Sequence, residues 1–375
     1  MSTPERLGEI LRNKGCLPAE WEASVAEVPR ELFLPDLIET PRGVLSRAQD
    51  PEGWMTAAYG DIPVTTQVND GAETTADAYR LPTSSSSMPS LMLEMLNQLN
   101  VQDGHRVLEL GAGTGLNAAW LARRLGGDRV TSVEVDAELA ERAAKNTQAA
   151  GQHPRIVCGD GANGWPADAP YDRVIATYTV PAISGAWVRQ APGGRIIAPW
   201  GNSFFSHSFA VLDVDGDQAH GAFTGYPAFM HDRANRPARG YLQDFLHHHD
   251  QASESLTGVS PLDIAHDSDA LFYVSLTLPD AWHVEVPAVD GSDEVTWWLL
   301  ADDRSSWAAA DHVPGQQEYV IAQYGPRRLW DEVEDAWHRW NTIGRPKRDR
   351  ARITVTASGQ EVHWAAPASS PIPSS

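Results

Sequence analysis

Residues 107–125, VLELGAGTGLNAAWLARRL, decide the fold of this chain. The opening VLEL is a short, mainly apolar run typical of a buried strand, and the residues from Leu116 onward carry apolar side chains at helical spacing. Between the two, Gly111, Gly113 and Gly115 allow a sharp turn and a close approach of the backbone to a ligand. A strand, a glycine-rich turn and a helix in this order predict a nucleotide-binding βα unit.

The spacing of these glycines separates two classes of nucleotide-binding protein. Dinucleotide-binding proteins carry G-x-G-x-x-G, but here Leu116 stands at the third glycine position and Gly115 falls one residue early. The pattern G-x-G-x-G, preceded by an acidic residue, matches the S-adenosylmethionine loop of Rossmann-like methyltransferases. We therefore expect S-adenosylmethionine as the cofactor, with these loop residues in contact with it: Glu109, Gly111, Ala112, Gly113, Thr114, Gly115 and Asn117.

Two acidic residues follow the next two predicted strands. Glu134, followed by Val135, ends RVTSVEV about 20 residues after the loop, where a carboxylate can accept hydrogen bonds from both ribose hydroxyls. Asp160 stands between Gly159 and Gly161 after RIVCG, where a carboxylate can accept the adenine amino group. Either acid could instead cap a helix or lie in a solvated loop, but the ordered series favours cofactor binding by all five residues.

The remaining apolar runs predict the fold class and the domains. RVLEL, RVTSVEV, RIVCG, YDRVIATY and GRIIAPW alternate with helical or loop stretches and predict a Rossmann-like, doubly wound α/β domain, with SFAVLDV and AHGAFTG as antiparallel additions. We expect a catalytic domain over residues 1–230, a linker over 231–254, a C-terminal α+β substrate-recognition domain over 255–365 and a disordered tail over 366–375. In the C-terminal domain, LFYVSLTL and TWWLLAD are predicted strands, residues 328–340 a helix, and ITVTASGQEVHW a hairpin that turns at Ser358 and Gly359.

Composition excludes several functional classes. The 375 residues carry a formal net charge of −21, from 50 acidic and 29 basic side chains, and such a surface repels nucleic acid. Neither a signal peptide nor a long apolar run is present, so we expect a cytoplasmic protein without a membrane partner. Cys16 and Cys158 have no metal-like spacing, and the adjacent histidines at 247–249 do not converge on one ion, so no metal is expected. The sequence does not indicate the oligomeric state.

Residues 5–205 resemble the protein L-isoaspartyl O-methyltransferases. The segments that carry the resemblance are EVPRELFLP, YGDIPV, GDGANGWPADAPYDRVIAT and PGGRIIAPWG. In that family a Ser-x-Pro segment upstream of the cofactor strand supplies the active-site hydroxyl, and Ser87-Met88-Pro89 stands in that place. The resemblance implies that Ser87, with Ser86 beside it, is catalytic in the methylation of a carboxylate. The four serines at 84–87 could instead form only a flexible helix cap.

The chain departs from the family's pattern after the fourth predicted strand. The family has small residues ending in a proline there, whereas this chain reads Tyr178-Thr179-Val180-Pro181. The bulkier side chains are expected to reshape the substrate pocket. The residues that we expect to bind the substrate are therefore Ser86, Ser87, Met88, Tyr178, Thr179 and Val180.

Residues 323–364 resemble the C-terminal portion of a branch of this family encoded beside ribosomally made peptides. Those enzymes methylate one aspartate of a maturing peptide, and the ester then closes to a succinimide (aspartimide). The resemblance implies a precursor or core peptide as the partner. General isoaspartate repair, and a peptide-binding protein that only holds the cofactor, remain alternatives.

Two groups of side chains in this region allow more than one interpretation. Trp330, Trp337 and Trp340 have helical spacing and are expected in the core rather than in a peptide groove. The basic residues form either a site for an acidic peptide or a solvated face: Arg327, Arg328, Arg345, Lys347, Arg348, Arg350 and Arg352.

Overall fold

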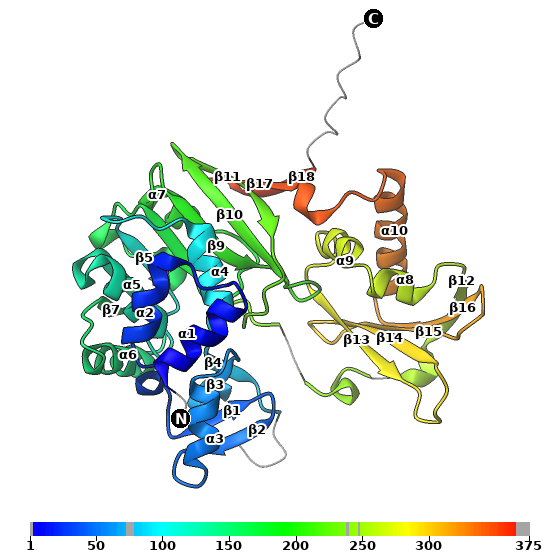
Figure 1. The fold of residues 1–375 in the computed structure, drawn as a ribbon. Helices are drawn as coiled ribbons and strands as arrows, with labels where there is room; N and C mark the ends of the chain where they lie inside the picture. Colours follow the sequence, from blue (N-terminus) through cyan, green and yellow to red (C-terminus); the bar gives the residue numbers. More distant parts are fainter. Residues whose placement is uncertain (1–2, 73–78, 238–239, 247, 365–375) are drawn as a thin grey trace, which may run out of the picture.

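A nine-stranded sheet forms the centre of the computed structural model, which describes residues 3–72, 79–237, 240–246 and 248–364 (Figure 1). Its strand order is β18-β17-β11-β10-β9-β8-β5-β6-β7. The five strands expected from the sequence pair in parallel: β5 (Val107–Leu110), β6 (Val130–Glu134), β7 (Arg155–Cys158), β8 (Arg173–Ala176) and β9 (Arg195–Trp200). The Rossmann-like, doubly wound α/β prediction is confirmed.

Both faces of this sheet are buried. Neighbouring strand residues alternate between two cores: Val174 and Ile196 belong to one, Ile175 and Ile197 to the other. The second of these cores also takes the apolar faces of α4 and α5, whereas Trp187 of α7 packs in the first. The helices concerned are α4 (Pro89–Leu99), α5 (Leu116–Leu125), α6 (Ala137–Ala149) and α7 (Gly185–Gln190).

Antiparallel strands extend the sheet on one side, and here the domain boundary expected from the sequence needs correction. β10 (Ser208–Asp215) and β11 (Gln218–Thr224) are the two predicted additions. The hairpin of β17 (Ala351–Thr356) and β18 (Gly359–Trp364), expected in a separate C-terminal domain, pairs with β11 instead. It covers what would otherwise be an unpaired sheet edge. Its turn lies at residues 357–358, one residue earlier than expected.

The N-terminal segment forms a small layer that leads into the serine run. Helices α1 (Pro4–Asn13), α2 (Glu22–Glu27) and α3 (Pro51–Ala58) accompany a four-stranded sheet of order β2-β1-β3-β4. Its strands are β1 (Leu37–Thr40), β2 (Gly43–Ser46), β3 (Val64–Val68) and β4 (Pro82–Ser86). β4 contains Ser84, Ser85 and Ser86, and Ser87 and Met88 connect it to α4.

The C-terminal part contains a five-stranded sheet with helices on one side of it (Figure 1). Five antiparallel strands have the order β12-β16-β15-β14-β13. They are β12 (Ser253–Thr257), β13 (Ala281–Pro287), β14 (Val295–Ala301), β15 (Trp307–His312) and β16 (Tyr319–Tyr324). The helices are α8 (Pro261–Ala265), α9 (Ser268–Ser275) and α10 (Leu329–Thr342).

One element of the C-terminal part was predicted wrongly. LFYVSLTL, expected as a strand, lies mostly in α9. The signal lay just outside the apolar run, because Asp267 accepts hydrogen bonds from the backbone N–H groups of Asp269 and Ala270 and so caps this helix. α10 and the burial of Trp330, Trp337 and Trp340 agree with the sequence-based expectations. The expected tail lies outside the described residues.

The two parts share one continuous core rather than meeting at a loose joint. Phe272 of α9 contacts the rings of Trp200 and Phe223 from the nine-stranded sheet and of Phe205 from the β9–β10 loop, with centroids 4.9–5.8 Å away. Asn202 Nδ2 donates to the Ser275 carbonyl at 2.9 Å. These contacts fix the C-terminal part against the nine-stranded sheet. In the described part of the chain, no helix is both long and apolar enough to span a membrane.

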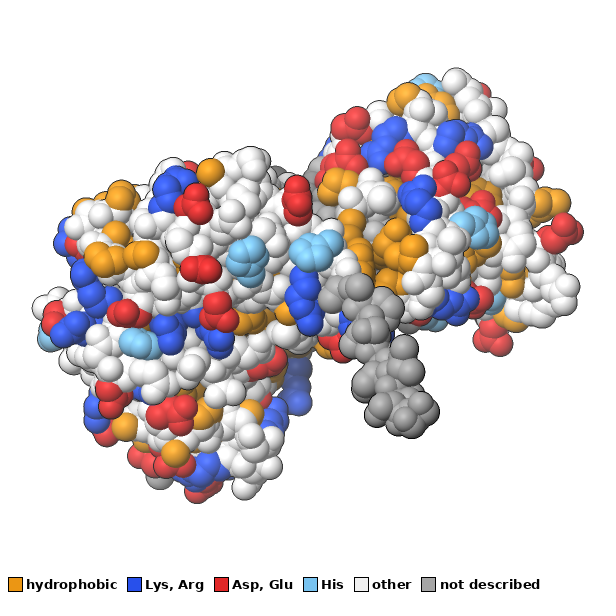
Figure 2. All heavy atoms as spheres, turned by 90° about the horizontal axis from the view of Figure 1, so that it is seen from above, with side chains coloured by type: hydrophobic (Ala, Val, Ile, Leu, Met, Phe, Trp, Pro, Cys, Tyr) orange, Lys and Arg blue, Asp and Glu red, His pale blue; other side chains and the backbone are white. Residues whose placement is uncertain are grey.

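The basic residues near the end of the chain do not form one continuous surface. Arg327 pairs with Asp280 and Glu332, and Arg328 with Asp331. Arg348 is buried and donates to the His207 carbonyl at 2.8 Å. On the face shown in Figure 2, basic and acidic side chains are interspersed over both lobes. These contacts favour structural roles for Arg327, Arg328 and Arg348 over an anion-binding patch.

The shared core predicts cooperative unfolding. Phe272→Ala should lower the free energy of unfolding by about 3–5 kcal/mol, since it opens a cavity among aromatic rings from both parts. The prediction is one thermal transition that moves as a whole in calorimetry, with the exposed Val289→Ala as the control. Two separate transitions, with the catalytic sheet unaffected, would contradict the shared core.

Candidate functional site

A cavity of about 410 Å³ opens at the carboxyl ends of β5, β6 and β8. In the sheet β5 lies between β6 and β8, so the chain winds away in opposite directions from this point, which is where α/β sheets bind ligands. The cofactor loop, the serines of β4 and residues 230–235 surround it. Its lining includes Ser84, Ser85, Ser86, Ser87, Glu109, Gly111, Ala112, Gly113, Thr114, Asn117, Glu134, Val135, Asp160, Gly161 and Tyr178.

The glycine loop has the backbone conformation that its sequence requires. Gly111 and Gly113 have φ values of 95° and 54°, which favour glycine. A Cβ at Gly111 would lie 2.7 Å from Thr177 Oγ1 and 2.8 Å from the ring of Tyr178, so the position also lacks space. Gly115 (φ 94°) begins α5. Gly115 and Gly159, expected to bind the cofactor, do not line the cavity. Their backbone N–H groups donate to the carbonyls of Ala112 and Glu134, so they stabilise the loops around it.

Glu134 is placed to hold two hydroxyl groups. Its side chain accepts the Gly113 N–H at 2.8 Å through one oxygen and the Asp136 N–H at 3.1 Å through the other. Burial raises the pKa of this carboxyl, and the two N–H groups oppose that rise. A carboxylate has about four acceptor positions, so two remain for the ribose hydroxyls of S-adenosylmethionine. The free acceptor positions of Glu134 therefore fit the two ribose hydroxyls of the cofactor.

Glu109 and Asp160 have different surroundings. Glu109 is fully buried and accepts Asn117 Nδ2 at 2.7 Å and the Ser132 hydroxyl; burial raises its pKa to about 7. It therefore orients Asn117 in the cavity wall. Asp160 is exposed and accepts the Ala162 N–H at 2.9 Å, as a helix cap would, while still lining the cavity.

Arg30, which the sequence analysis did not single out, is fully buried behind the serines. Its guanidinium donates to Ser86 Oγ (3.1 Å) and to the carbonyls of Ser86 (3.0 Å) and Ser87 (3.2 Å). It also donates to the carbonyls of Ala58, Gly60 and Ile62. Burial lowers the pKa of Arg30 to about 10, so the group keeps its charge at neutral pH. The only sequence signal was its place in EVPRELFLP.

Asp61, from YGDIPV, holds the other end of the same turn. Its side chain accepts the Ser90 N–H at 2.8 Å, in the first turn of α4, and the Lys14 ammonium at 2.6 Å. Burial raises the pKa of Asp61, but these hydrogen bonds outweigh it and the pKa is lowered. The turn at residues 86–90 is therefore clamped between Arg30 and Asp61.

The expected substrate residues divide into two groups. Ser86, Ser87 and Tyr178 line the cavity. Thr179 and Val180 are buried instead. Thr179 donates its N–H to the Met230 carbonyl at 2.7 Å and so holds the segment that follows β11, whereas Val180 donates its N–H to the Pro199 carbonyl of β9 at 3.0 Å. Met88 lines a separate pocket beside residues 15–18.

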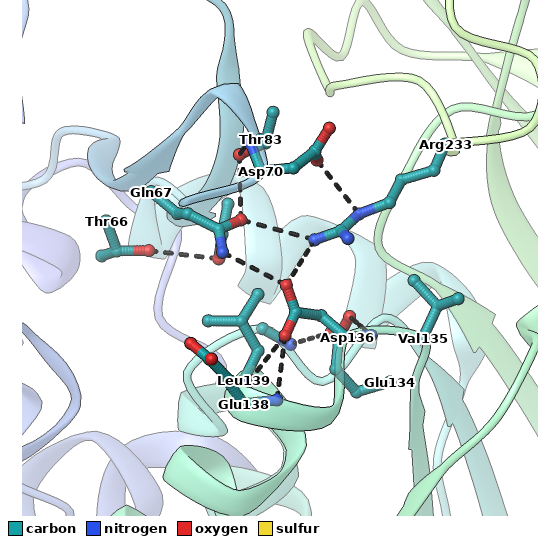
Figure 3. Close-up of polar contacts among 12 residues, drawn as sticks. Thr66, Gln67, Asp70, Thr83, Glu134, Val135, Asp136, Glu138, Leu139 and Arg233 are labelled. Carbon is teal, nitrogen blue, oxygen red and sulfur yellow. Dashed lines mark hydrogen bonds and ion pairs between the residues drawn. The ribbon is translucent and has the colours of Figure 1, made fainter. Parts of the chain in front are cut away.

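We call residues 230–236 the strap, and residues 230–235 form the remaining wall of the cavity. Arg233 forms ion pairs with Asp136 (2.9 Å) and Asp70 (3.3 Å; Figure 3), and Arg236 pairs with Asp70 at 2.9 Å. Burial raises the pKa of Asp136, but hydrogen bonds from Arg233, Leu139 N–H and Gln67 lower it further, to about 2. Residues 231–236 were expected to lie in the linker (231–254). The partners of Arg233 and Arg236 lie 97 and 166 positions away in the chain, so no local pattern predicts these contacts.

No cluster of three or more metal-ligating side chains occurs in the residues that the structure describes. His247, part of the histidine run, lies outside them.

Comparisons with known proteins agree with this geometry. The family model of protein-L-isoaspartate(D-aspartate) O-methyltransferase matches residues 3–220. A protein-L-isoaspartate O-methyltransferase of Hyperthermus butylicus is 31% identical over 219 residues, covering 55% of this chain and 78% of that protein. One of Methanopyrus kandleri is 32% identical over 231 residues, covering 60% and 89%.

A solved structure extends the comparison to the C-terminal part. It is named protein-L-isoaspartate O-methyltransferase and aligns with a TM-score of 0.56 at 22% identity, covering 97% of this chain and all of that one. The two chains therefore share a fold that includes the five-stranded C-terminal sheet.

The strap predicts slow release of the cofactor. Arg233→Gln removes the ion pairs that attach the strap to Asp136 and Asp70, so the strap should open more often. S-adenosylhomocysteine should then dissociate about tenfold faster. Stopped-flow displacement measures this rate. Arg123→Gln, which removes an ion pair with Glu27 away from the cavity, is the matched control. Equal dissociation rates in the Arg233 variant and the wild type would show that the strap does not retain the ligand.

Proposed function

This chain belongs to the protein-L-isoaspartate(D-aspartate) O-methyltransferase family, and we propose that it methylates one aspartate side chain of a ribosomally synthesised, post-translationally modified peptide. It is an S-adenosylmethionine-dependent carboxyl methyltransferase. The observation that carries the proposal is that the glycine loop and the serine turn line the same cavity. The precursor or core peptide is then the partner.

The cofactor wall fits its ligand chemically. When bound, S-adenosylmethionine supplies an electrophilic methyl group on a sulfonium. Glu134 would hold the ribose hydroxyls, Asp160 would accept the adenine amino group, and the glycine loop would let the backbone approach the ligand. The acidic residues of this wall also favour a cationic ligand.

The acceptor needs alignment rather than activation. An aspartate carboxyl has a pKa near 4, so it is ionised at neutral pH and requires no general base. The enzyme has to orient one carboxylate oxygen and exclude water. Ser87 lines the cavity and is the hydroxyl that would hold the carboxylate, whereas the Ser86 hydroxyl is buried and accepts a hydrogen bond from Arg30. Ser86 therefore positions the turn.

The product ester is set up for ring closure. Methoxide leaves more readily than oxide, so the backbone nitrogen of the next residue can attack the ester carbonyl carbon. A C–N bond forms, the C–O bond to the methoxy group breaks, and methanol leaves with the amide proton. The product is a five-membered succinimide, which water can open to aspartate or isoaspartate. No side chain of the enzyme is required for this step.

Two features support a peptide aspartate as the acceptor. Tyr178 occupies the position where the family has a small residue, and its ring lies against Gly111 while its hydroxyl lies against Gly161. This side chain narrows the cavity beside the cofactor loops. The second feature is the resemblance of residues 323–364 to the peptide-maturation branch.

General repair of isoaspartate in proteins is the second candidate. The relatives and the solved structure that also possesses the C-terminal sheet are named protein-L-isoaspartate O-methyltransferase, and that name fits repair. The C-terminal part alone therefore does not distinguish the two functions.

Labelled S-adenosylmethionine separates these candidates. The enzyme is incubated with an isoaspartyl test peptide and with any precursor peptide that is found encoded beside its gene. Peptide maturation predicts strong labelling of the precursor and weak labelling of the isoaspartyl peptide. Strong turnover of the isoaspartyl peptide would instead support repair.

Ser87→Ala should lower kcat about a hundredfold, because one hydrogen-bond donor to the reacting carboxylate is lost. Its affinity for S-adenosylhomocysteine, measured by calorimetry, should not change. Ser255→Ala on the exposed strand β12 is the control. Wild-type kcat in the Ser87 variant would exclude this hydroxyl from the site.

A further inference from the structure

The charges that line the cavity suit the cofactor but not the acceptor. Four acidic residues line it, Glu109, Glu134, Asp160 and Asp232, of which Glu109 is only partly ionised at neutral pH because burial raises its pKa to about 7. Among the lining residues that the structure describes, Arg233 is the one Lys or Arg, and it already pairs with Asp136 and Asp70. Such a wall attracts a sulfonium but repels an anionic carboxylate. A source of positive potential is therefore needed on the acceptor side.

Arg30 lies behind the acceptor side of the cavity. It directly contacts Ser86 and Ser87, which line the cavity, while being 1% exposed itself. A buried cation interacts more strongly with nearby charges than an exposed one, because less water screens it. Its pKa of about 10 keeps it protonated at neutral pH.

The hydrogen bonds of Arg30 also orient the backbone of the turn. The carbonyls of Ser86 and Ser87 both point at the guanidinium. In a planar trans peptide the C=O and the following N–H point in opposite directions. The N–H groups of Ser87 and Met88 therefore point away from Arg30, with their partial positive charges on the far side of the turn. Aligned N–H groups of this kind favour an anion.

We propose that Arg30 is a positioning residue that holds the serine turn and makes the acceptor side of the cavity attractive to a carboxylate. This inference rests on the proposed function, because it requires an anionic acceptor at Ser87. Arg30 does not touch the reacting atoms; it acts through the backbone of Ser86 and Ser87 and through its charge.

Asp61 provides a test with the opposite sign. It holds Ser90 at the other end of the turn and carries the negative charge that interacts with Arg30. Asp61→Asn keeps an acceptor oxygen for the Ser90 N–H but removes the charge. If the effect is electrostatic, this variant strengthens carboxylate binding, whereas Arg30→Gln weakens it. A purely structural clamp would weaken binding in Arg30→Gln and leave it unchanged or weaker in Asp61→Asn.

The experiment compares a peptide that the wild-type enzyme methylates with the same peptide carrying asparagine in place of the acceptor. Calorimetry with S-adenosylhomocysteine present gives the ratio of the two affinities. Arg30→Gln should lower the preference for the carboxylate about tenfold. Arg30→Lys should keep most of the preference but lower kcat, because an ammonium cannot make the planar set of hydrogen bonds. Asp61→Asn should raise the preference.

Unchanged affinity for S-adenosylhomocysteine shows that each variant is folded. An unchanged preference in Arg30→Gln overturns the inference. If that variant does not fold, Asp61→Asn decides: a raised preference supports the electrostatic role, and a lowered or unchanged one overturns it. A wild-type enzyme that methylates neither an aspartyl nor an isoaspartyl peptide overturns the proposed function and, with it, this inference.

Discussion

The buried guanidinium of Arg30 is the constraint on which the acceptor side of the site depends. A buried cation must be hydrogen-bonded, and Arg30 meets that need with carbonyls from two segments, residues 58–62 and 86–87. Asp61 then fixes the start of α4 through Ser90. The turn between β4 and α4 is therefore determined by charges from the N-terminal layer rather than by its own serines, which alone would form a flexible stretch.

The cofactor side depends on a different set of long-range contacts. Arg233 and Arg236 bring the strap to Asp70 and Asp136, next to Glu134, the carboxylate proposed to accept the ribose hydroxyls. The strap leads into the C-terminal part, which is fixed to the first sheet by Phe272 and by the β17–β18 hairpin. The C-terminal part is thus connected to the cofactor site through packed structure, and a role in substrate choice would not require it to move.

The sequence predicted the elements that local patterns determine. The glycine loop, the five parallel strands and α10 follow from glycine spacing, apolar periodicity and helix signals. What escaped prediction depends on contacts far apart in the chain. The apolar run of α9 has no clear period, so its cap at Asp267 was overlooked. The pairing of β17 with β11 and the bonds of Arg30 and Arg233 leave no local signal, although Arg30 and Asp61 both lie in segments that carried the family resemblance.

Hydrogen exchange at single amides tests the clamp most directly. The Ser90 N–H donates to the buried side chain of Asp61, which lies 29 positions away in the chain, whereas the Gly53 N–H, also in the first turn of a helix, donates to its own N-cap residue Asp50 at an exposed helix end. If Arg30 and Asp61 hold the turn rigidly, the Ser90 amide of the unliganded protein should exchange about a hundredfold more slowly than the Gly53 amide. Equal exchange rates would show that the turn opens freely and would contradict the account.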